Sequence, residues 1–167
     1  RSRRTARLQL ARPRGGGADG FLRRVVVEYV AQASPASGDP LPGTCHATGW
    51  KCADADNRVL LEIRVIGDEW FLDTFVKSGE NRLTHYAENF KHKIGAWYHV
   101  TLVFDGSEMR HYVDGKLELT GKLTLSPFGK GKTSLGVRQN KVHWFKGAIR
   151  RVRITKYALS PAKFMKK

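Results

Sequence analysis

Short runs of alternating apolar and polar residues recur along this sequence, and they constrain its fold more than any other feature. Residues 98–104 are one example, and such runs are separated by Gly, Asp, Asn and Ser. Period-two alternation places one face of a strand in a core, whereas a helix repeats its apolar positions every three to four residues. Helical periodicity is almost absent, so the sequence predicts an antiparallel all-β protein.

Ten segments are predicted to form strands: residues 7–10, 25–32, 59–66, 70–77, 82–86, 98–104, 109–113, 116–119, 134–138 and 148–155. This number of strands in one domain predicts two packed sheets. Asp105-Gly106 and Asp114-Gly115 fit tight hairpin turns, because glycine accepts a positive φ. We therefore expect one meander from residue 59 to residue 119. Residues 33–58, which are rich in Pro and Gly, are predicted to form a long surface loop.

Positive charge is concentrated at the two ends of the chain. The sequence contains 30 Lys and Arg against 15 Asp and Glu, a net charge of +15. All acidic residues lie between Asp19 and Glu118, whereas residues 1–18 contain six arginines and residues 119–167 contain thirteen lysines or arginines. This asymmetry bears on partners and solubility rather than on fold. Two interpretations stay open, a solvated basic surface or a docking face for an anionic partner.

Four stretches of sequence carry a family resemblance: VEYV at residues 27–30, GAWYHV at 95–100, RHYVDG at 110–115 and FKGAIRRVRI at 145–154. In this order and spacing they resemble the laminin G-like branch of the concanavalin A-like lectin and glucanase family. The resemblance implies a two-sheet antiparallel jelly-roll sandwich with one concave sheet. It places the jelly roll at residues 21–164, after a basic arm and first strand at 1–20 and before a basic tail at 165–167. Members of the family are usually extracellular and bind glycans or proteins, often with calcium.

One predicted hairpin supplies a candidate ligand site. Tyr98 and Val100 belong to the core face of its first strand, so His99 points the other way, as do Arg110 and Tyr112 on the next strand. If this hairpin lies in the concave sheet, these three side chains line a groove in which Tyr112 can stack on a sugar. The alternative is that they only complete the surface of the sheet.

Several other residues have a predicted role outside that hairpin. Trp144 and Trp50, the latter in the long loop, are a second candidate for stacking a ligand, with simple packing as the alternative. Asp73 lies in a strand that is apolar on both faces and needs a partner, which Arg64 or Arg82 can supply. His111 falls on the core face and is predicted to be buried and hydrogen-bonded.

Arginines from both chain ends are predicted to form a basic face. The resemblance implies that the first and last strands pair in one sheet, usually the sheet opposite the groove. Period two then places Arg151 and Arg153 on the same face, and guanidinium forks suit sulfate, carboxylate and phosphate groups. The residues predicted to contact an anionic partner are Arg3, Arg4, Arg7, Arg150, Arg151, Arg153 and Lys156.

The two cysteines and the acidic part of the long loop suggest further sites. Cys45 and Cys52 are predicted to close a small loop by a disulfide in an oxidising compartment, and the alternative is two free thiols. A zinc site is disfavoured because it needs about four ligands. Calcium is implied by the resemblance, and Asp54 and Asp56 are the only acidic loop residues that suit it.

Three functions remain open on the sequence alone. The first is a non-catalytic carbohydrate-binding or adhesion module that is secreted, periplasmic or on the cell surface, with an acidic glycan as ligand. The second is a structural or assembly subunit of a larger extracellular complex that docks an acidic protein. The third is a polysaccharide lyase or hydrolase.

The sequence contains no motif for polysaccharide cleavage or for specific nucleic-acid binding. The residue types of a lyase are present as Glu62, Arg64, His85-Tyr86 and His111-Tyr112, but no catalytic motif accompanies them. Nucleic acid would be attracted only non-specifically, by charge. No apolar run is long enough to cross a bilayer.

Overall fold

Antiparallel strands make up nearly all the regular structure of the described chain. The computed structural model describes residues 24–34, 45–53, 57–126, 132–141 and 144–167, with the backbone alone for 45–53. Its elements are β1 (Val25–Ala33), β2 (Cys45–Ala53), β3 (Asn57–Ile66), β4 (Glu69–Ser78), β5 (Asn81–Tyr86), β6 (His92–Lys93), β7 (Trp97–Phe104), β8 (Glu108–Val113), β9 (Lys116–Lys122), β10 (Lys132–Leu135), β11 (Gly147–Thr155) and a 3₁₀ turn, Pro161–Lys163. None of the described residues forms a helix long and apolar enough to span a membrane. The predicted strand at residues 7–10 lies outside the described residues.

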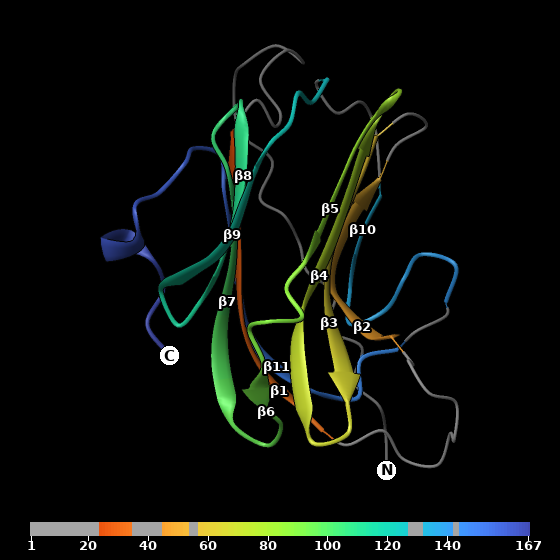
Figure 1. The fold of residues 1–167 in the computed structure, drawn as a ribbon, viewed down its shortest axis with the longest axis vertical. Coiled ribbons are helices and arrows are strands. Elements are labelled where there is room, and N and C mark those ends of the chain that lie inside the picture. Colours follow the sequence, from red (N-terminus) through yellow and green to blue (C-terminus); the bar gives the residue numbers. More distant parts are fainter. Residues whose placement is uncertain (1–23, 35–44, 54–56, 127–131, 142–143) are drawn as a thin grey trace.

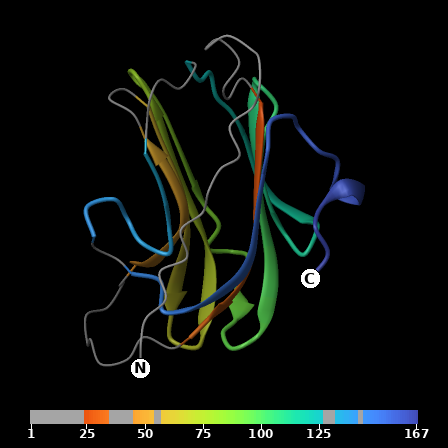
Figure 2. The ribbon, with the colours of Figure 1, turned by 180° about the vertical axis from the view of Figure 1, so that it is seen from behind.

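The strands form two sheets that pack face to face (Figures 1 and 2). One sheet has five strands in the order β11-β1-β7-β8-β9, and the other has the order β10-β2-β3-β4-β5, with β6 paired to β4. The predicted two-sheet antiparallel jelly-roll sandwich is therefore confirmed. Strand β1 pairs with the last strand, β11, with Glu28 opposite Arg153; pairing of the predicted strand at residues 7–10 stays a prediction.

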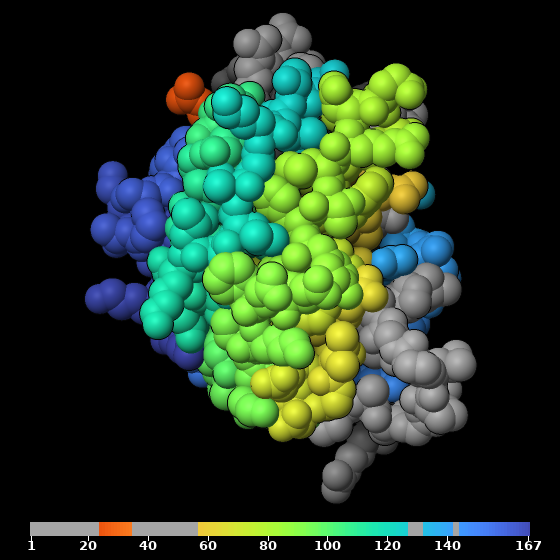
Figure 3. Space-filling model, viewed as in Figure 1, coloured from red at the N-terminus to blue at the C-terminus, as the bar shows by residue number. Residues whose placement is uncertain are grey.

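Alternation along each strand places the apolar core between the sheets. Val100, Leu102 and Phe104 of β7 point into it, as predicted, and are at most 1% exposed. Each such side chain contributes roughly 1.5–3 kcal/mol on burial. Side chains of β5 and β9 close one edge of the sandwich, where the two strands are in contact (Figure 3).

Tight turns at Asp-Gly pairs join neighbouring strands, as the sequence predicts. Asp114 and Gly115 adopt φ values of 49° and 78°, which a tight β8–β9 hairpin turn requires. The Asp114 carboxylate also accepts the backbone N–H of His99 at 2.9 Å. The predicted single meander is instead two, β3-β4-β5 and β7-β8-β9, because the chain changes sheet between β6 and β7.

Strand β2 corrects the prediction for residues 33–58. It pairs with β3 and β10 inside the six-stranded sheet, where Cys45 lies opposite Arg64 and Cys52 opposite Val59. Arg64 and Val59, the partners of the two cysteines, lie five positions apart on β3, which corresponds to about 16 Å along the strand. A disulfide, in contrast, needs Cα atoms within about 7 Å of each other. The predicted Cys45–Cys52 disulfide is therefore incompatible with this strand. The sequence does not predict this strand because residues 45–53 lack apolar alternation and follow a Pro-rich stretch.

The C-terminal segment crosses the outer face of the five-stranded sheet (Figures 1 and 2). We call residues 158–167 the strap. Phe164 is 9% exposed and packs with Val26, Val103 and Tyr112 of the sheet. The strap therefore covers a face that would otherwise expose apolar and aromatic side chains to water.

Candidate functional site

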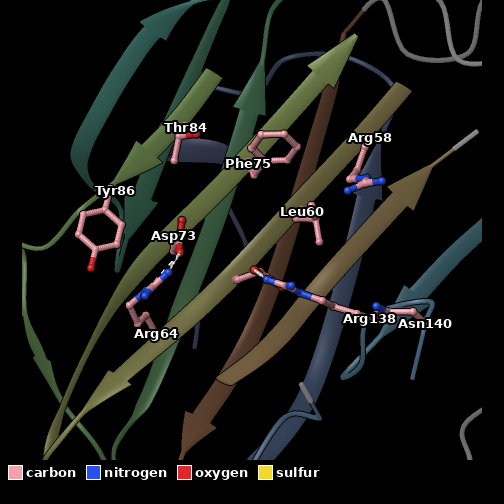
Figure 4. A pocket seen from close by; sticks show the side chains of 10 residues that line it. Arg58, Leu60, Arg64, Asp73, Phe75, Thr84, Tyr86, Arg138 and Asn140 are labelled. Atoms are coloured by element: carbon pink, nitrogen blue, oxygen red, sulfur yellow. Dashed lines mark hydrogen bonds and ion pairs between the residues drawn. The ribbon is translucent and has the colours of Figure 1, made fainter. Parts of the chain in front are cut away.

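A groove of about 480 Å³ runs across the outer face of the six-stranded sheet, on the side away from the core (Figure 4). Alternate residues of β3, β4 and β5 form its floor, and the connection between β10 and β11 closes one side. The lining residues are Arg58, Leu60, Glu62, Arg64, Asp73, Phe75, Thr84, Tyr86, Arg138 and Asn140.

Arg64 and Asp73 form an ion pair on the groove floor. The Arg64 Nη2 atom donates to Asp73 Oδ2 at 2.6 Å, from β3 to the neighbouring β4 (Figure 4). The predicted partner of Asp73 is thus confirmed as Arg64. The Arg64 guanidinium also lies 5.0 Å from the centre of the Tyr86 ring, a distance at which a cation and an aromatic face attract. The ion pair and the ring contact together fix this arginine in the groove.

Arg138 reaches the groove floor from the connection between β10 and β11. Its Nε atom donates to Glu62 Oε1 at 2.6 Å, and Nη2 donates to the other oxygen of the same carboxylate. Glu62 is only 3% exposed, so this two-pronged pair compensates for the burial of its charge. The pair ties the connection, including Asn140, to the sheet.

Arg58 and two aromatic rings complete the groove surface. Arg58 is exposed, and no described carboxylate lies within ion-pairing distance of it. Tyr86 is 40% exposed and Phe75 is half-buried. An exposed cation and aromatic surface in one groove suit an extended ligand that combines an acidic group with an apolar ring face.

Sequence reasoning missed most of this groove. The sequence predicts strands at residues 59–66 and 70–77, but it does not show that the outer-face residues of β3 share a groove. Period two along β3 would have grouped Arg58, Leu60, Glu62 and Arg64 on one face. Only the tertiary structure brings Arg138 beside them.

The hairpin predicted to bind a ligand lies in the other sheet, beneath the strap. Tyr112 is 8% exposed with its ring 5.1 Å from that of Phe164, and His99 is 3% exposed with Nε2 bonded to buried Glu28. Arg110 is paired with Asp105 and Glu108. His99 borders a cavity of about 490 Å³ at the strap. The strap therefore covers Tyr112 and His99 in the place predicted for a sugar, whereas ligand binding by Arg110 stays a prediction.

The other predicted ligand and metal residues are only partly described. Trp144 is 61% exposed on the connection that also carries Arg138 and Asn140. Trp50 lies in β2, opposite Leu61 and Leu135, with only its backbone described. Asp54 and Asp56 lie outside the described residues, which contain no cluster of three or more His, Cys, Asp or Glu suited to a metal ion. Calcium binding stays a prediction.

The predicted basic face is described only for its C-terminal half. Arg151 and Arg153 share the outer face of the five-stranded sheet, since both donate to carbonyls of the strap. Arg153 is also bound to buried Glu28, and Arg150 lies 4.9 Å from the Trp97 ring centre. Lys156 follows β11. Arg3, Arg4 and Arg7 lie outside the described residues.

The residues of the lyase hypothesis do not converge. Glu62, Arg64 and Tyr86 line the groove, but each of the two charged groups is held in an ion pair. His85 points into the sandwich and contacts His111 there, with ring centres 4.8 Å apart. General acid–base catalysis needs such groups to meet at one substrate atom, and this arrangement separates them by a sheet.

A family model described as the concanavalin A-like lectin/glucanases superfamily, of the laminin G type, matches residues 46–163. No curated protein sequence matches the chain. Among solved structures, domain 4 of AbnA, an extracellular GH43 arabinanase from Geobacillus stearothermophilus in complex with arabinotriose, superposes with a TM-score of 0.64 at 19% identity. The match covers 84% of this chain and 64% of that domain.

Two other solved structures share the fold. The CBM40 domain of a Ruminococcus gnavus IT-sialidase has a TM-score of 0.61 at 14% identity, covering 86% of this chain and 82% of that one. A SAP-like pentraxin from Limulus polyphemus has a TM-score of 0.56 at 16% identity, covering 83% and 66%. At such identities the similarity concerns the fold.

Proposed function

The chain belongs to the concanavalin A-like lectin/glucanase superfamily, and from this premise we propose that it is a non-catalytic carbohydrate-binding module. Its ligand is an acidic glycan, bound in the groove on the outer face of the six-stranded sheet. The observation that carries the proposal is the groove itself, which exposed Arg58 lines towards one end and Tyr86 towards the other, with Phe75 between them (Figure 4). Solved structures of the same fold were determined with arabinotriose and with sialyllactose, which supports a glycan as ligand.

Each side of the groove has a part in the proposed binding. Arg58 supplies a charge-assisted hydrogen bond to a carboxylate or sulfate of the glycan. Tyr86 offers its ring to the apolar face of a sugar, while Arg64 and Arg138 are held by Asp73 and Glu62. Preformed ion pairs keep the groove in one shape, so little ordering is needed on binding.

The proposed location is outside the cytoplasm, secreted, periplasmic or at the cell surface. It is supported by the extracellular arabinanase to which one matching domain belongs. The incompatibility of the Cys45–Cys52 disulfide with β2 removes the second argument that the sequence offered for this location.

A glycan array at low and moderate salt tests the proposed ligand class. We expect uronate-bearing, sialylated or sulfated glycans to bind above their neutral counterparts, with binding weakened by salt because exposed charges are screened. The variant Arg58→Gln should lose roughly tenfold to hundredfold in affinity, as expected for one charge-assisted hydrogen bond. Tyr86→Ala should weaken acidic and neutral glycans alike.

The matched control is Arg24→Gln, an exposed arginine at the start of the other sheet, which should bind as the wild type does. Absence of binding to every glycan would refute the proposal. Release of unsaturated or reducing ends from uronate polymers would refute its non-catalytic part.

A further inference from the structure

The strap carries a basic surface on the side of the sandwich opposite the groove (Figure 1). Two of its apolar side chains, Leu159 and Phe164, pack inward against the five-stranded sheet. Lys163 and Lys166 are exposed, and no described carboxylate lies within ion-pairing distance of them. The strap therefore presents these two cations to solvent.

Hydrogen bonds to the strap backbone hold it in place and leave these two lysine side chains outside. Arg153 Nη2 donates to the carbonyl of Lys163 at 2.8 Å, and Arg151 donates to the carbonyl of Lys166. The N–H of Met165 donates to Glu28 Oε1 at 2.7 Å. Lys163 is thus held beside Arg153, and Lys166 beside Arg151, which is itself exposed.

Glu28 is the buried anchor of this arrangement. Its side chain is fully buried, and besides Met165 it accepts from His99 Nε2 at 3.1 Å and from Arg153 Nε at 2.5 Å. Burial alone would raise the pKa of Glu28, but these donors outweigh it and hold the pKa below its usual range. The carboxylate therefore stays ionised at neutral pH and joins β1, β7, β11 and the strap.

We propose that the strap and β11 form a second binding face for a polyanionic polysaccharide, preorganised by Glu28. Arg151, Lys163 and Lys166 contact its carboxylate or sulfate groups. The choice of a polysaccharide rests on the proposed function, since a polymer of the class bound in the groove can engage both faces with a raised effective concentration. The domain would then bridge two polysaccharide molecules, or two parts of one polysaccharide molecule.

Chromatography of the full chain on immobilised dextran sulfate with a salt gradient tests the second face. We expect the double variant Lys163→Gln/Lys166→Gln to elute at clearly lower salt than the wild type. The matched control, Lys132→Gln/Lys141→Gln, removes two exposed lysines from the other side of the molecule and should elute close to the wild type. Equal shifts in the two double variants would show that only total charge matters and would overturn the proposal.

Glu28→Gln separates preorganisation from net charge. This variant gains one positive charge, so a charge-only surface predicts later elution, whereas a strap that has lost its anchor predicts earlier elution. Phe164→Ala releases the strap without changing the charge and should also elute earlier, which keeps the test valid if Glu28→Gln does not fold. Later elution of folded Glu28→Gln together with unchanged elution of Phe164→Ala would refute the role of the strap.

Comparing array binding with retention on dextran sulfate distinguishes this inference from the groove proposal. Arg58→Gln should lose its array ligand and elute from dextran sulfate only slightly earlier than the wild type, whereas the strap double variant should keep its array ligand and elute from dextran sulfate much earlier. Retention on dextran sulfate without any array ligand would refute the groove function and leave the basic face standing. Duplex DNA or phosphatidylserine vesicles bound at the same salt as dextran sulfate would overturn the polysaccharide assignment.

Discussion

Two histidines from opposite sheets meet inside the sandwich without hydrogen-bond partners. His85 and His111 are buried, and neither has a partner for either ring nitrogen among the described residues. Burial lowers the pKa of both, and with the nearby His85 it brings that of His111 to about 3. The core position of His111 was predicted from alternation and is confirmed, but its predicted hydrogen bond is not observed. Alternation assigns a face and says nothing about what the opposite sheet offers there.

Stability should therefore fall as the pH is lowered from about 6.5 towards 5. In this window the unfolded chain protonates His111 and the folded chain does not, so acid favours unfolding by up to about 1.4 kcal/mol per pH unit. Urea unfolding at several pH values measures the slope. The variant His111→Leu should show a shallower slope, and a slope equal to that of the wild type would contradict this account.

Strand β11 depends on a glycine at its first position. Gly147 has φ of 151° and lies opposite Ala33 at the end of β1. A Cβ atom at this position would lie 2.1 Å from the backbone carbonyl oxygen of Gln32, which cannot move as a flexible side chain can. The pairing of the first and last described strands thus requires the close approach that only glycine permits.

Gly147→Ala is expected to destabilise the domain by roughly 1–3 kcal/mol, the range for locally strained backbone. Thermal or urea unfolding measures the loss. The neighbouring substitution Ala148→Ser adds an oxygen at an exposed position and serves as the control, with little expected change. A Gly147→Ala variant as stable as the control would show that β11 tolerates displacement from β1.

At the scale of the whole molecule, the two outer faces of the sandwich have different roles. The six-stranded sheet leaves its outer face open as a groove, whereas the strap covers the outer face of the five-stranded sheet. The strap is linked to the sheet through one buried carboxylate, so its backbone is held although most of it is irregular. The two proposed binding faces can accordingly be altered independently, since they share no residue.

Hydrogen exchange tests whether the strap is held as one piece with the sheet. The Met165 amide donates to buried Glu28, so we expect it to exchange slowly in spite of its irregular surroundings. In Glu28→Gln its protection should fall while the amides of β7 keep theirs. Fast exchange of Met165 in the wild type would mean that the strap is not anchored.

Local patterns predicted most of the strands, the Asp-Gly turns, the core face of β7 and the Arg64–Asp73 pair. Such features depend on residues close in sequence or on adjacent hairpin strands, where period two and turn chemistry act directly. Strand β2 was missed because its place in the six-stranded sheet depends on β3 and β10 rather than on its own composition.

The sequence by itself determined an antiparallel sandwich with basic ends, because alternation and charge are properties of the chain alone. The tertiary structure decided which faces are open. Tyr112 and His99 point outward as predicted, yet Phe164, distant in sequence, covers them. One side of the groove is likewise formed by Arg138, which binds Glu62, 76 positions away. Burial of an outward face depends on which distant segment packs against it, and no local pattern specifies that segment.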